Sequence, residues 1–265
     1  MSDARHPNQP ATLGGPSRSR LWWEIAIVLA LGLGQSAIYA IVSIVNRLTL
    51  PDTPLSQQST TLNPSLSDRE IFDFIYQILG IAFGLAPVLL VCFLLWNRER
   101  PHLARLGLDG FRPASDIGRG LSLALIIGVG GIAIYVGARL LGQAVAVNAA
   151  GLDPRWWTIP VLLLSALRAG LQEELVVIGY LFARLRDVGW SRWQIIVGSA
   201  VLRGSYHLYQ GWGGFVGNLI MGLIFGWLYT RWGRVLPFVI AHAVIDAAIF
   251  VGYPWAASTF PGIFG

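Results

Sequence analysis

The fold is decided by one stretch in the second half of the chain, residues Thr158 to Leu185, which reads TIPVLLLSALRAGLQEELVVIGYLFARL. The run is long enough to cross the hydrocarbon core of a bilayer as a helix, which takes about 20 residues. It nevertheless carries Arg168, Gln172, Glu173 and Glu174 near its middle. The stretch therefore predicts a membrane-spanning helix whose polar side chains need a separate explanation.

The composition of the 265-residue chain indicates a membrane protein. Hydrophobic residues make up 54% and charged residues 12%, whereas soluble domains contain about 25% charged residues. This balance excludes an ordinary soluble enzyme. Lysine is absent, and the 19 arginines lie mainly between apolar runs, which indicates membrane topology and no nucleic-acid partner. The single cysteine, Cys92, excludes a disulfide framework and a cysteine-based metal site.

Apolar runs recur along nearly the whole chain and predict an all-α fold, a polytopic transmembrane helical bundle of about seven spans. The predicted spans are Leu21 to about Asn46, Ile71–Trp96, about Ile117–Leu141, about Thr158–Leu185, Trp193–Tyr209, Phe215–Tyr229 and Val235–Tyr253.

The spans divide the chain into four parts. Residues 1–20, rich in Pro, Ser, Gly and Arg, are expected to form a disordered cytoplasmic tail. Residues 21–141 are expected to form an N-terminal transmembrane scaffold, because they contain few polar side chains away from span ends. Residues 158–253 are expected to form the functional core, and residues 254–265 a C-terminal tail.

The arginines orient this bundle. With the N-terminus in the cytoplasm, thirteen arginines fall in cytoplasmic segments, three in external segments and three within spans. This asymmetry is typical of multi-pass membrane proteins, whose cytoplasmic loops are enriched in basic residues. We therefore expect an integral multi-pass membrane protein with a cytoplasmic N-terminus. The use of arginine alone suggests a GC-rich bacterium, and hence a bacterial cell membrane.

Ionisable side chains within the spans concentrate in the last third of the chain. Each such side chain near the middle of a span costs about 2.5–3.5 kcal/mol on insertion scales, so it calls for a reason. Adjacent Glu173 and Glu174 are about 100° apart on a helix. Two pairs, Arg203 with His207 and His242 with Asp246, have a spacing of four residues, which puts each pair on one helix face. This clustering favours a functional site over a polar network that only ties helices together.

Three stretches carry a resemblance to a known family. QEELVVIGYLFARL, LRGSYHLYQG and IAHAVID begin at Gln172, Leu202 and Ile240. They resemble the motifs E-E-x-x-x-R, F-x-x-x-H and H-x-x-x-N/D of the CPBP family, also called the Abi family, which comprises CAAX-prenyl endopeptidases and bacteriocin-processing or immunity proteins. The resemblance covers about residues 158–253. It implies an intramembrane endopeptidase, often labelled a metalloprotease, whose substrate is a membrane-associated or lipidated peptide or protein.

Two positions depart from the family pattern. The arginine of the first motif falls on Ile178, and the phenylalanine of the second motif falls on Arg203. One guanidinium is thus missing from one helix and another has appeared on the next. We predict that Arg203 supplies the missing positive charge from across the site by pairing with Glu173 or Glu174, because an unpaired arginine there would be costly.

The resemblance also implies roles for the site residues. Glu173 would act as the general base that takes a proton from water, with His207 holding that water. His242 and Asp246 match the positions that stabilise the oxyanion, although Asp246 can instead orient His242. Glu174 is either a supporting partner or the base itself.

Other chemistry and other functions remain open at this stage. We expect no cofactor, but zinc held by Glu173, His207 and His242 is an alternative, although the chain lacks an H-E-x-x-H motif. The rival functions are a proton-coupled transporter, since buried Glu, Asp and His also form proton relays, and a non-catalytic scaffold or immunity protein.

Overall fold

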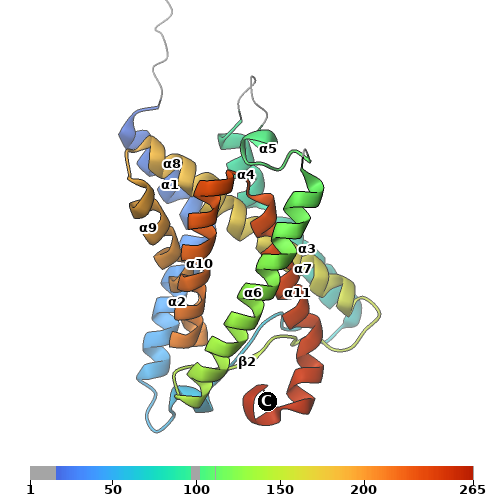
Figure 1. The fold of residues 1–265 in the computed structure, drawn as a ribbon. Helices are drawn as coiled ribbons and strands as arrows, with labels where there is room; N and C mark the ends of the chain where they lie inside the picture. The colour runs from blue at the N-terminus through green and yellow to red at the C-terminus, as the bar shows by residue number, and fades with distance from the viewer. Residues whose placement is uncertain (1–15, 97–101, 111, 265) are drawn as a thin grey trace, which may run out of the picture.

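The computed structural model describes residues 16–96, 102–110 and 112–264. About 76% of the residues that the structure describes are helical, which confirms the predicted all-α bundle. The described strands form one small parallel sheet, in which β1 (Ser59–Thr61) pairs with β2 (Ala146–Asn148) and Ser59 lies opposite Ala146. This sheet joins two loops at one end of the bundle, where α6 and the C-terminal helices also end (Figure 1).

Helices occupy all seven segments that the apolar runs predict. They are α1 (Arg18–Ala30), α2 (Leu33–Leu48), η1 (Leu55–Gln57), α3 (Glu70–Gly84), α4 (Ala86–Leu94), α5 (His102–Arg105), α6 (Pro113–Leu140), α7 (Thr158–Glu173), η2 (Glu174–Leu181), α8 (Phe182–Asp187), α9 (Arg192–Ser205), η3 (Leu208–Gln210), α10 (Trp212–Trp232), α11 (Leu236–Thr259) and α12 (Pro261–Phe264).

The ends of the chain extend the predicted helical region. Helix α1 begins at Arg18, inside the segment predicted as a tail, while residues 1–15 of that segment lie outside the described residues. At the other end, α11 continues to Thr259 and α12 follows it, so most of residues 254–264 are helical.

The predicted count of about seven spans is not confirmed. Among the residues that the structure describes, four helical segments are long and apolar enough to cross a membrane, and the bent pair α1 and α2 makes up to five. These two helices meet at an angle of 59°. The continuous helix from α7 to α8 is not among the four, and it carries Arg168, Glu173 and Glu174 in its middle. Helix α9 is only 14 residues long.

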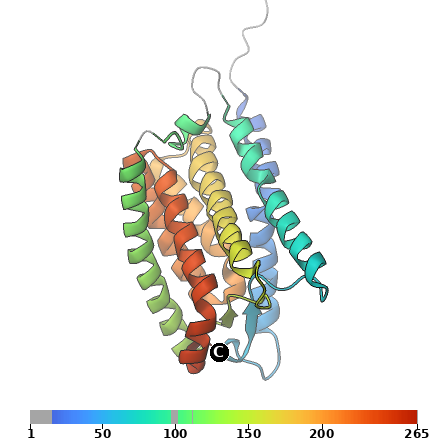
Figure 2. The same cartoon turned by 90° about the vertical axis from the view of Figure 1, so that its right-hand side faces the viewer.

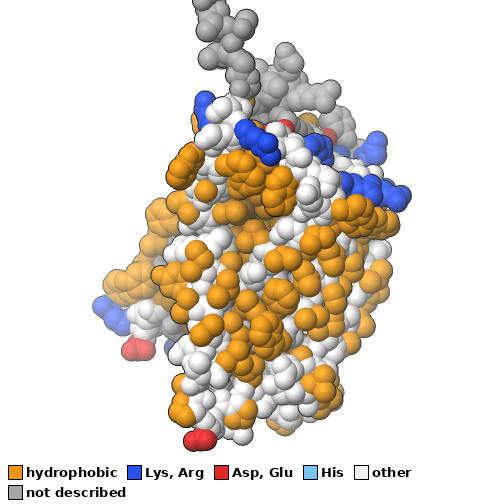
Figure 3. Space-filling model, turned by 90° about the vertical axis from the view of Figure 1, so that its left-hand side faces the viewer, with side chains coloured by type: hydrophobic (Ala, Val, Ile, Leu, Met, Phe, Trp, Pro, Cys, Tyr) orange, Lys and Arg blue, Asp and Glu red, His pale blue; other side chains and the backbone are white. Residues whose placement is uncertain are grey.

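The surface is that of an integral membrane protein. Large hydrophobic side chains such as Phe83, Phe93 and Leu125 are at least 69% exposed. Figure 3 shows hydrophobic side chains over the body of one face, with arginines gathered at the end where α1 begins. Burial of such side chains in lipid, in place of water, removes the cost of exposing them.

The helices that carry the polar residues lie at the centre of the bundle. Helix α11 packs against α6 and α7, and α10 packs against α9 and α6. Figures 1 and 2 show α6, α7, α10 and α11 running alongside one another, while α3 and α4 lie at the edge next to α7. Helices α3 and α4 of the scaffold therefore cover one side of α7, while α11 packs on another and α9 contacts η2, which continues from α7.

A buried ion pair holds the turn between α10 and α11. The guanidinium of Arg234 donates hydrogen bonds to Asp116 at 2.6–3.0 Å and to Asp109 at 2.8 Å. These bonds, foremost those to Asp116, raise the pKa of Arg234 well above its ordinary value. The adjacent Val235 amide donates to the carbonyl oxygen of Leu106 at 2.9 Å. The segment after α5 is thereby fastened to the start of α11.

Close packing of α9 on α10 depends on a glycine. A Cβ atom at Gly222 would lie 2.8 Å from the Cα atom of Ala200 and 3.4 Å from Cδ of Arg203. Small residues allow membrane helices to approach closely. The absence of a side chain at Gly222 also leaves room for the side chain of Arg203.

Gly222→Ala should therefore destabilise the protein, because the new methyl group meets backbone that cannot move without separating α9 from α10. We expect a loss of about 1–3 kcal/mol in the free energy of unfolding, measured by thermal unfolding in a mild detergent. Gly131→Ala on α6 is the control, since a Cβ there has no atom within 4 Å. Equal unfolding temperatures for the two variants would contradict this account of the packing.

Candidate active site

The two adjacent glutamates lie where α7 changes into a π-helix. Glu173 is the last residue of α7, and Glu174 is the first of η2, a π-helix that continues to Leu181. Short π segments with i to i+5 hydrogen bonds are frequent at functional sites. The glutamate side chains differ in exposure: Glu174 is completely buried, whereas Glu173 keeps 13% of its side chain accessible. The two carboxylates are thus suited to different tasks.

Glu174 is held by two cationic or ionisable side chains from other helices. Its Oε1 accepts a hydrogen bond from Nη2 of Arg203 on α9 at 2.7 Å. The same oxygen lies 2.7 Å from Nδ1 of His242 on α11. Arg203 is itself fully buried, so both charges of this pair are removed from solvent. The predicted pairing of Arg203 with one of the glutamates is confirmed.

Glu173 faces a different set of groups. Its Oε2 accepts a hydrogen bond from the hydroxyl of Tyr206 at 2.7 Å. The Nε2 atom of His207 lies 3.8 Å from this oxygen, and Nη1 of Arg203 lies 3.9 Å from it. Two polar atoms 3.8 Å apart can both hydrogen bond to one water molecule placed beside them. The spacing of Glu173 and His207 is therefore compatible with one water molecule that bridges them.

His242 lies between two carboxylates. Its Nδ1 faces Glu174, and its Nε2 lies 3.6 Å from Oδ2 of Asp246, one turn further along α11. A distance of 3.6 Å is an ion-pair contact and is too long for a hydrogen bond. The two contacts fix the plane of the imidazole ring, so its Nε2 edge is directed toward the side of the site where Asp246 and Glu173 lie.

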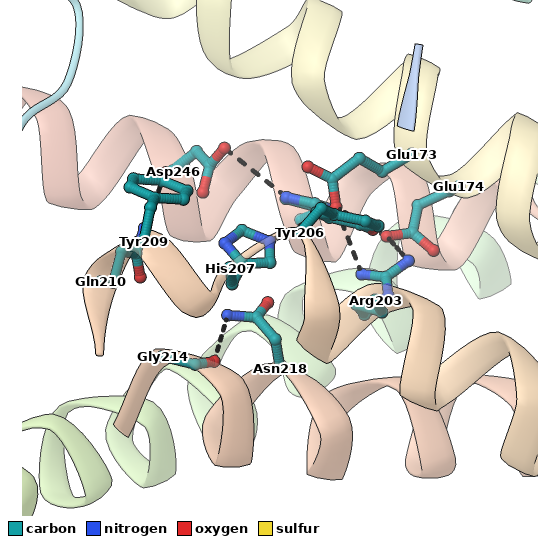
Figure 4. Close-up of polar contacts among 11 residues, drawn as sticks. Glu173, Glu174, Arg203, Tyr206, His207, Tyr209, Gln210, Gly214, Asn218 and Asp246 are labelled. Carbon is teal, nitrogen blue, oxygen red and sulfur yellow. Dashed lines mark hydrogen bonds and ion pairs between the residues drawn. The ribbon is translucent and has the colours of Figure 1, made fainter. Parts of the chain in front are cut away.

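Figure 4 shows how these side chains converge. Glu173 and Asp246 lie on one side of His207, and Asn218 of α10 lies on the other, donating a hydrogen bond to the Gly214 carbonyl oxygen at 3.0 Å. Both ring nitrogens of His207 are buried without a hydrogen bond in the described structure. Buried polar atoms without a partner are rare in proteins, so these two ring nitrogens call for an explanation.

The structure brings together all six residues predicted for the site: Glu173, Glu174, Arg203, His207, His242 and Asp246. It adds Tyr206, which the sequence analysis missed, although its position next to His207 is a signal that could have revealed it. Asn218, a polar residue within the predicted span Phe215–Tyr229, also lies beside His207 in Figure 4.

The zinc alternative fits this arrangement poorly. In the part of the chain that the structure describes, no group of three or more His, Cys, Asp or Glu side chains has a metal-binding arrangement. Nδ1 of His242 is directed at Glu174, and the Arg203 guanidinium lies 3.9 Å from the Glu173 carboxylate. A divalent cation at Glu173 would face that positive charge.

Fold and site together define a helical membrane protein with a carboxylate, histidine and arginine centre inside its bundle. Residues 155–248 match the family model described as "Type II CAAX prenyl endopeptidase Rce1-like". The match confirms the resemblance read from the three motifs and, at the level of the family, supports a membrane protease. No curated protein and no solved structure matches the chain significantly.

Replacing Arg203 by methionine should strongly destabilise the protein, because it leaves the buried carboxylate of Glu174 without its positive partner. We expect a loss of about 3–5 kcal/mol in the free energy of unfolding. Thermal unfolding in detergent measures this loss. The double variant Arg203→Met with Glu174→Met removes both charges and should be more stable than the single variant. A single variant that unfolds at the wild-type temperature would show that the pair does not stabilise the bundle.

Proposed function

We propose that the protein is an intramembrane endopeptidase that hydrolyses a peptide bond of a membrane-associated or lipidated protein, using a water molecule activated by Glu173. The observation that carries this proposal is the unequal environment of the two glutamates. Glu174 is buried and its Oε1 is occupied by Arg203 and His242, whereas Glu173 is partly accessible and faces His207. A general base must reach a water molecule, and Glu173 is the glutamate that can.

The proposed reaction begins with a water molecule bound between Glu173 and His207. Glu173 takes a proton from the water molecule. At the same time the oxygen of the water forms a bond to the scissile carbonyl carbon, which produces a tetrahedral oxyanion. Glu173 then passes this proton to the amide nitrogen as the C–N bond breaks. His207 holds the water through Nε2, and Tyr206 positions the Glu173 carboxylate through its hydroxyl.

His242 is the best-placed group to stabilise the oxyanion. Its Nδ1 contacts Glu174, so Nε2 is the edge that can donate to a substrate oxygen. Asp246, 3.6 Å from Nε2, orients the ring in this proposal and makes no direct contact with the oxyanion. Glu174 and Arg203 act as the supporting pair that holds His242 and the Glu173 backbone in place.

The proposed orientation has the N-terminus in the cytoplasm of a bacterial cell. The gathering of arginines at the end where α1 begins (Figure 3) supports this placement, because basic residues are retained on the cytoplasmic side. The substrate then enters from the bilayer, which surrounds the apolar faces of the bundle.

The decisive test compares Glu173→Gln with Glu174→Gln on quenched peptides, with and without a lipid chain, using purified protein in detergent. Glu173→Gln should lower kcat by at least about 100-fold, the usual contribution of a general base, with an unchanged unfolding temperature. Glu174→Gln should lower both activity and unfolding temperature, because it removes the counter-charge of Arg203. Glu70→Gln, in an exposed ion pair with Arg155, is the matched control.

Three results would contradict parts of this proposal. Retained activity in Glu173→Gln with loss in Glu174→Gln would transfer the role of base to Glu174. Loss of wild-type activity with a chelator would restore the zinc alternative. Absence of turnover on every peptide, with all variants folded, would favour a non-catalytic scaffold.

A further inference from the structure

A cavity of about 350 Å³ opens between the first turn of α3 and the segment that leads into α7. It is lined by Glu70, Ile71, Phe74, Trp156 and Trp157. Helix α3 packs against α7, and Figure 2 shows that both helices begin away from the end of the bundle where α1 begins. The peptidase mechanism proposed above uses none of these side chains, so the cavity needs an explanation of its own.

Three of the five side chains that line the cavity are aromatic. The ring centroid of Phe74 lies 5.9 Å from that of Trp156 and 5.5 Å from that of Trp157, with the ring planes tilted by 44° and 46°. Phe74 and Trp157 also pack in one apolar cluster with Val161 of α7, which fixes their positions. Tilted rings leave part of each π face uncovered, and such faces attract cations, ammonium groups above all. The cavity is therefore suited to an ammonium group.

The charges at the cavity favour a ligand with both a positive and a negative group. Glu70 supplies a carboxylate to the lining, and its Oε2 lies 3.5 Å from Nη1 of Arg155. Both side chains are more than 40% exposed, and exposed ion pairs contribute little to stability. Exchange of these partners for those of a ligand therefore costs little. A ligand whose ammonium group lies beside Glu70 can place an adjoining phosphate on the guanidinium of Arg155.

The cavity lies at the depth of the phospholipid headgroups. Helices α3 and α4 together form Glu70–Leu94, one of the segments long and apolar enough to cross a membrane, and Glu70 is its first residue. Trp156 and Trp157 directly precede α7, and tryptophan is enriched at the boundary between lipid and water. Further along α3, the side chains of Ile71 and Ile75 are exposed and apolar. A lipid can thus place its acyl chains along α3 and its headgroup in the cavity.

We propose that this cavity binds the headgroup of a zwitterionic phospholipid, with the ammonium group between the aromatic rings and Glu70 and the phosphate on Arg155. An anionic phospholipid has the same phosphate but no cation for the rings and the carboxylate, so it is a poorer ligand. The start of α7 at Thr158 lies fifteen residues, about 22 Å, from Glu173. Binding at the cavity is therefore independent of the endopeptidase function and leaves turnover of peptides in detergent unchanged.

Isothermal titration calorimetry of the full-length protein in a mild detergent tests this assignment. The ligands are three short-chain phospholipids with identical acyl chains, whose headgroups carry choline, ethanolamine or glycerol. All three have the same phosphate, and the glycerol lipid lacks the cation. Titration into protein-free detergent micelles is subtracted. We expect the choline and ethanolamine lipids to bind at least about tenfold more tightly than the glycerol lipid.

Trp156→Leu keeps an apolar side chain but removes one π face. It should weaken binding of the choline and ethanolamine lipids about threefold to tenfold and leave the glycerol lipid unchanged. Glu70→Gln should have the same selective effect, because it removes the negative charge beside the ammonium group. Trp227→Leu on α10 is the matched control, since Trp227 is also an exposed tryptophan with a guanidinium, that of Arg231, over its ring.

The outcomes separate a built headgroup site from general attraction of lipid. Equal binding of the three lipids, absence of binding, or an equal loss in Trp156→Leu and Trp227→Leu would overturn the assignment. Tighter binding of ethanolamine than of choline would support it and show that Glu70 accepts hydrogen bonds from the ammonium group; the reverse order would support it and give the main role to the aromatic rings. Trp156 is 79% exposed, so its replacement should leave the unfolding temperature unchanged.

Discussion

The buried pair of Glu174 and Arg203 is the constraint on which the rest of the site depends. Both side chains are completely inaccessible to solvent, and each would be very costly without the other. The pair fastens η2 to α9, and through Glu174 it also positions His242 of α11. Three helices that meet at one carboxylate are thereby held in a single arrangement, which leaves Glu173 and His207 facing one another.

Close helix packing makes this arrangement possible. Gly222 allows α10 to approach α9 at Ala200, next to the Arg203 side chain, and Gly170 allows α7 to approach the backbone of α11 at Val239. Without these approaches the charged groups would be separated, and their attraction could not offset the loss of hydration. Packing of small residues and pairing of charges therefore support one another here.

The exchange of charges between two motifs has a simple structural meaning. Ile178, where the related motif has an arginine, is completely buried, and the guanidinium at Arg203 reaches Glu174 from the neighbouring helix. The positive charge beside the second glutamate is thus present although its position in the chain has changed. What matters to the carboxylate is the location of the guanidinium in space and not the helix that carries it.

The sequence by itself determined that the protein is an all-helical membrane protein with its polar residues in the last third. Apolar runs and arginine placement carry that information, because lipid admits few alternatives to helices. The pairing of Arg203 with a glutamate was likewise predictable from the cost of burying an unpaired charge.

Only the tertiary structure decided which glutamate is accessible, that Tyr206 contacts it, and that fewer segments than predicted resemble complete spans. Glu173 and Glu174 are neighbours in the chain, so their exposure depends on which helices cover each side of α7 and on where η2 begins. The side chains of Arg168 and Gln172 lie next to breaks in two distant helices, at Gly84 and Gly32 respectively. Contacts between segments so far apart arise from packing, which local sequence patterns do not encode.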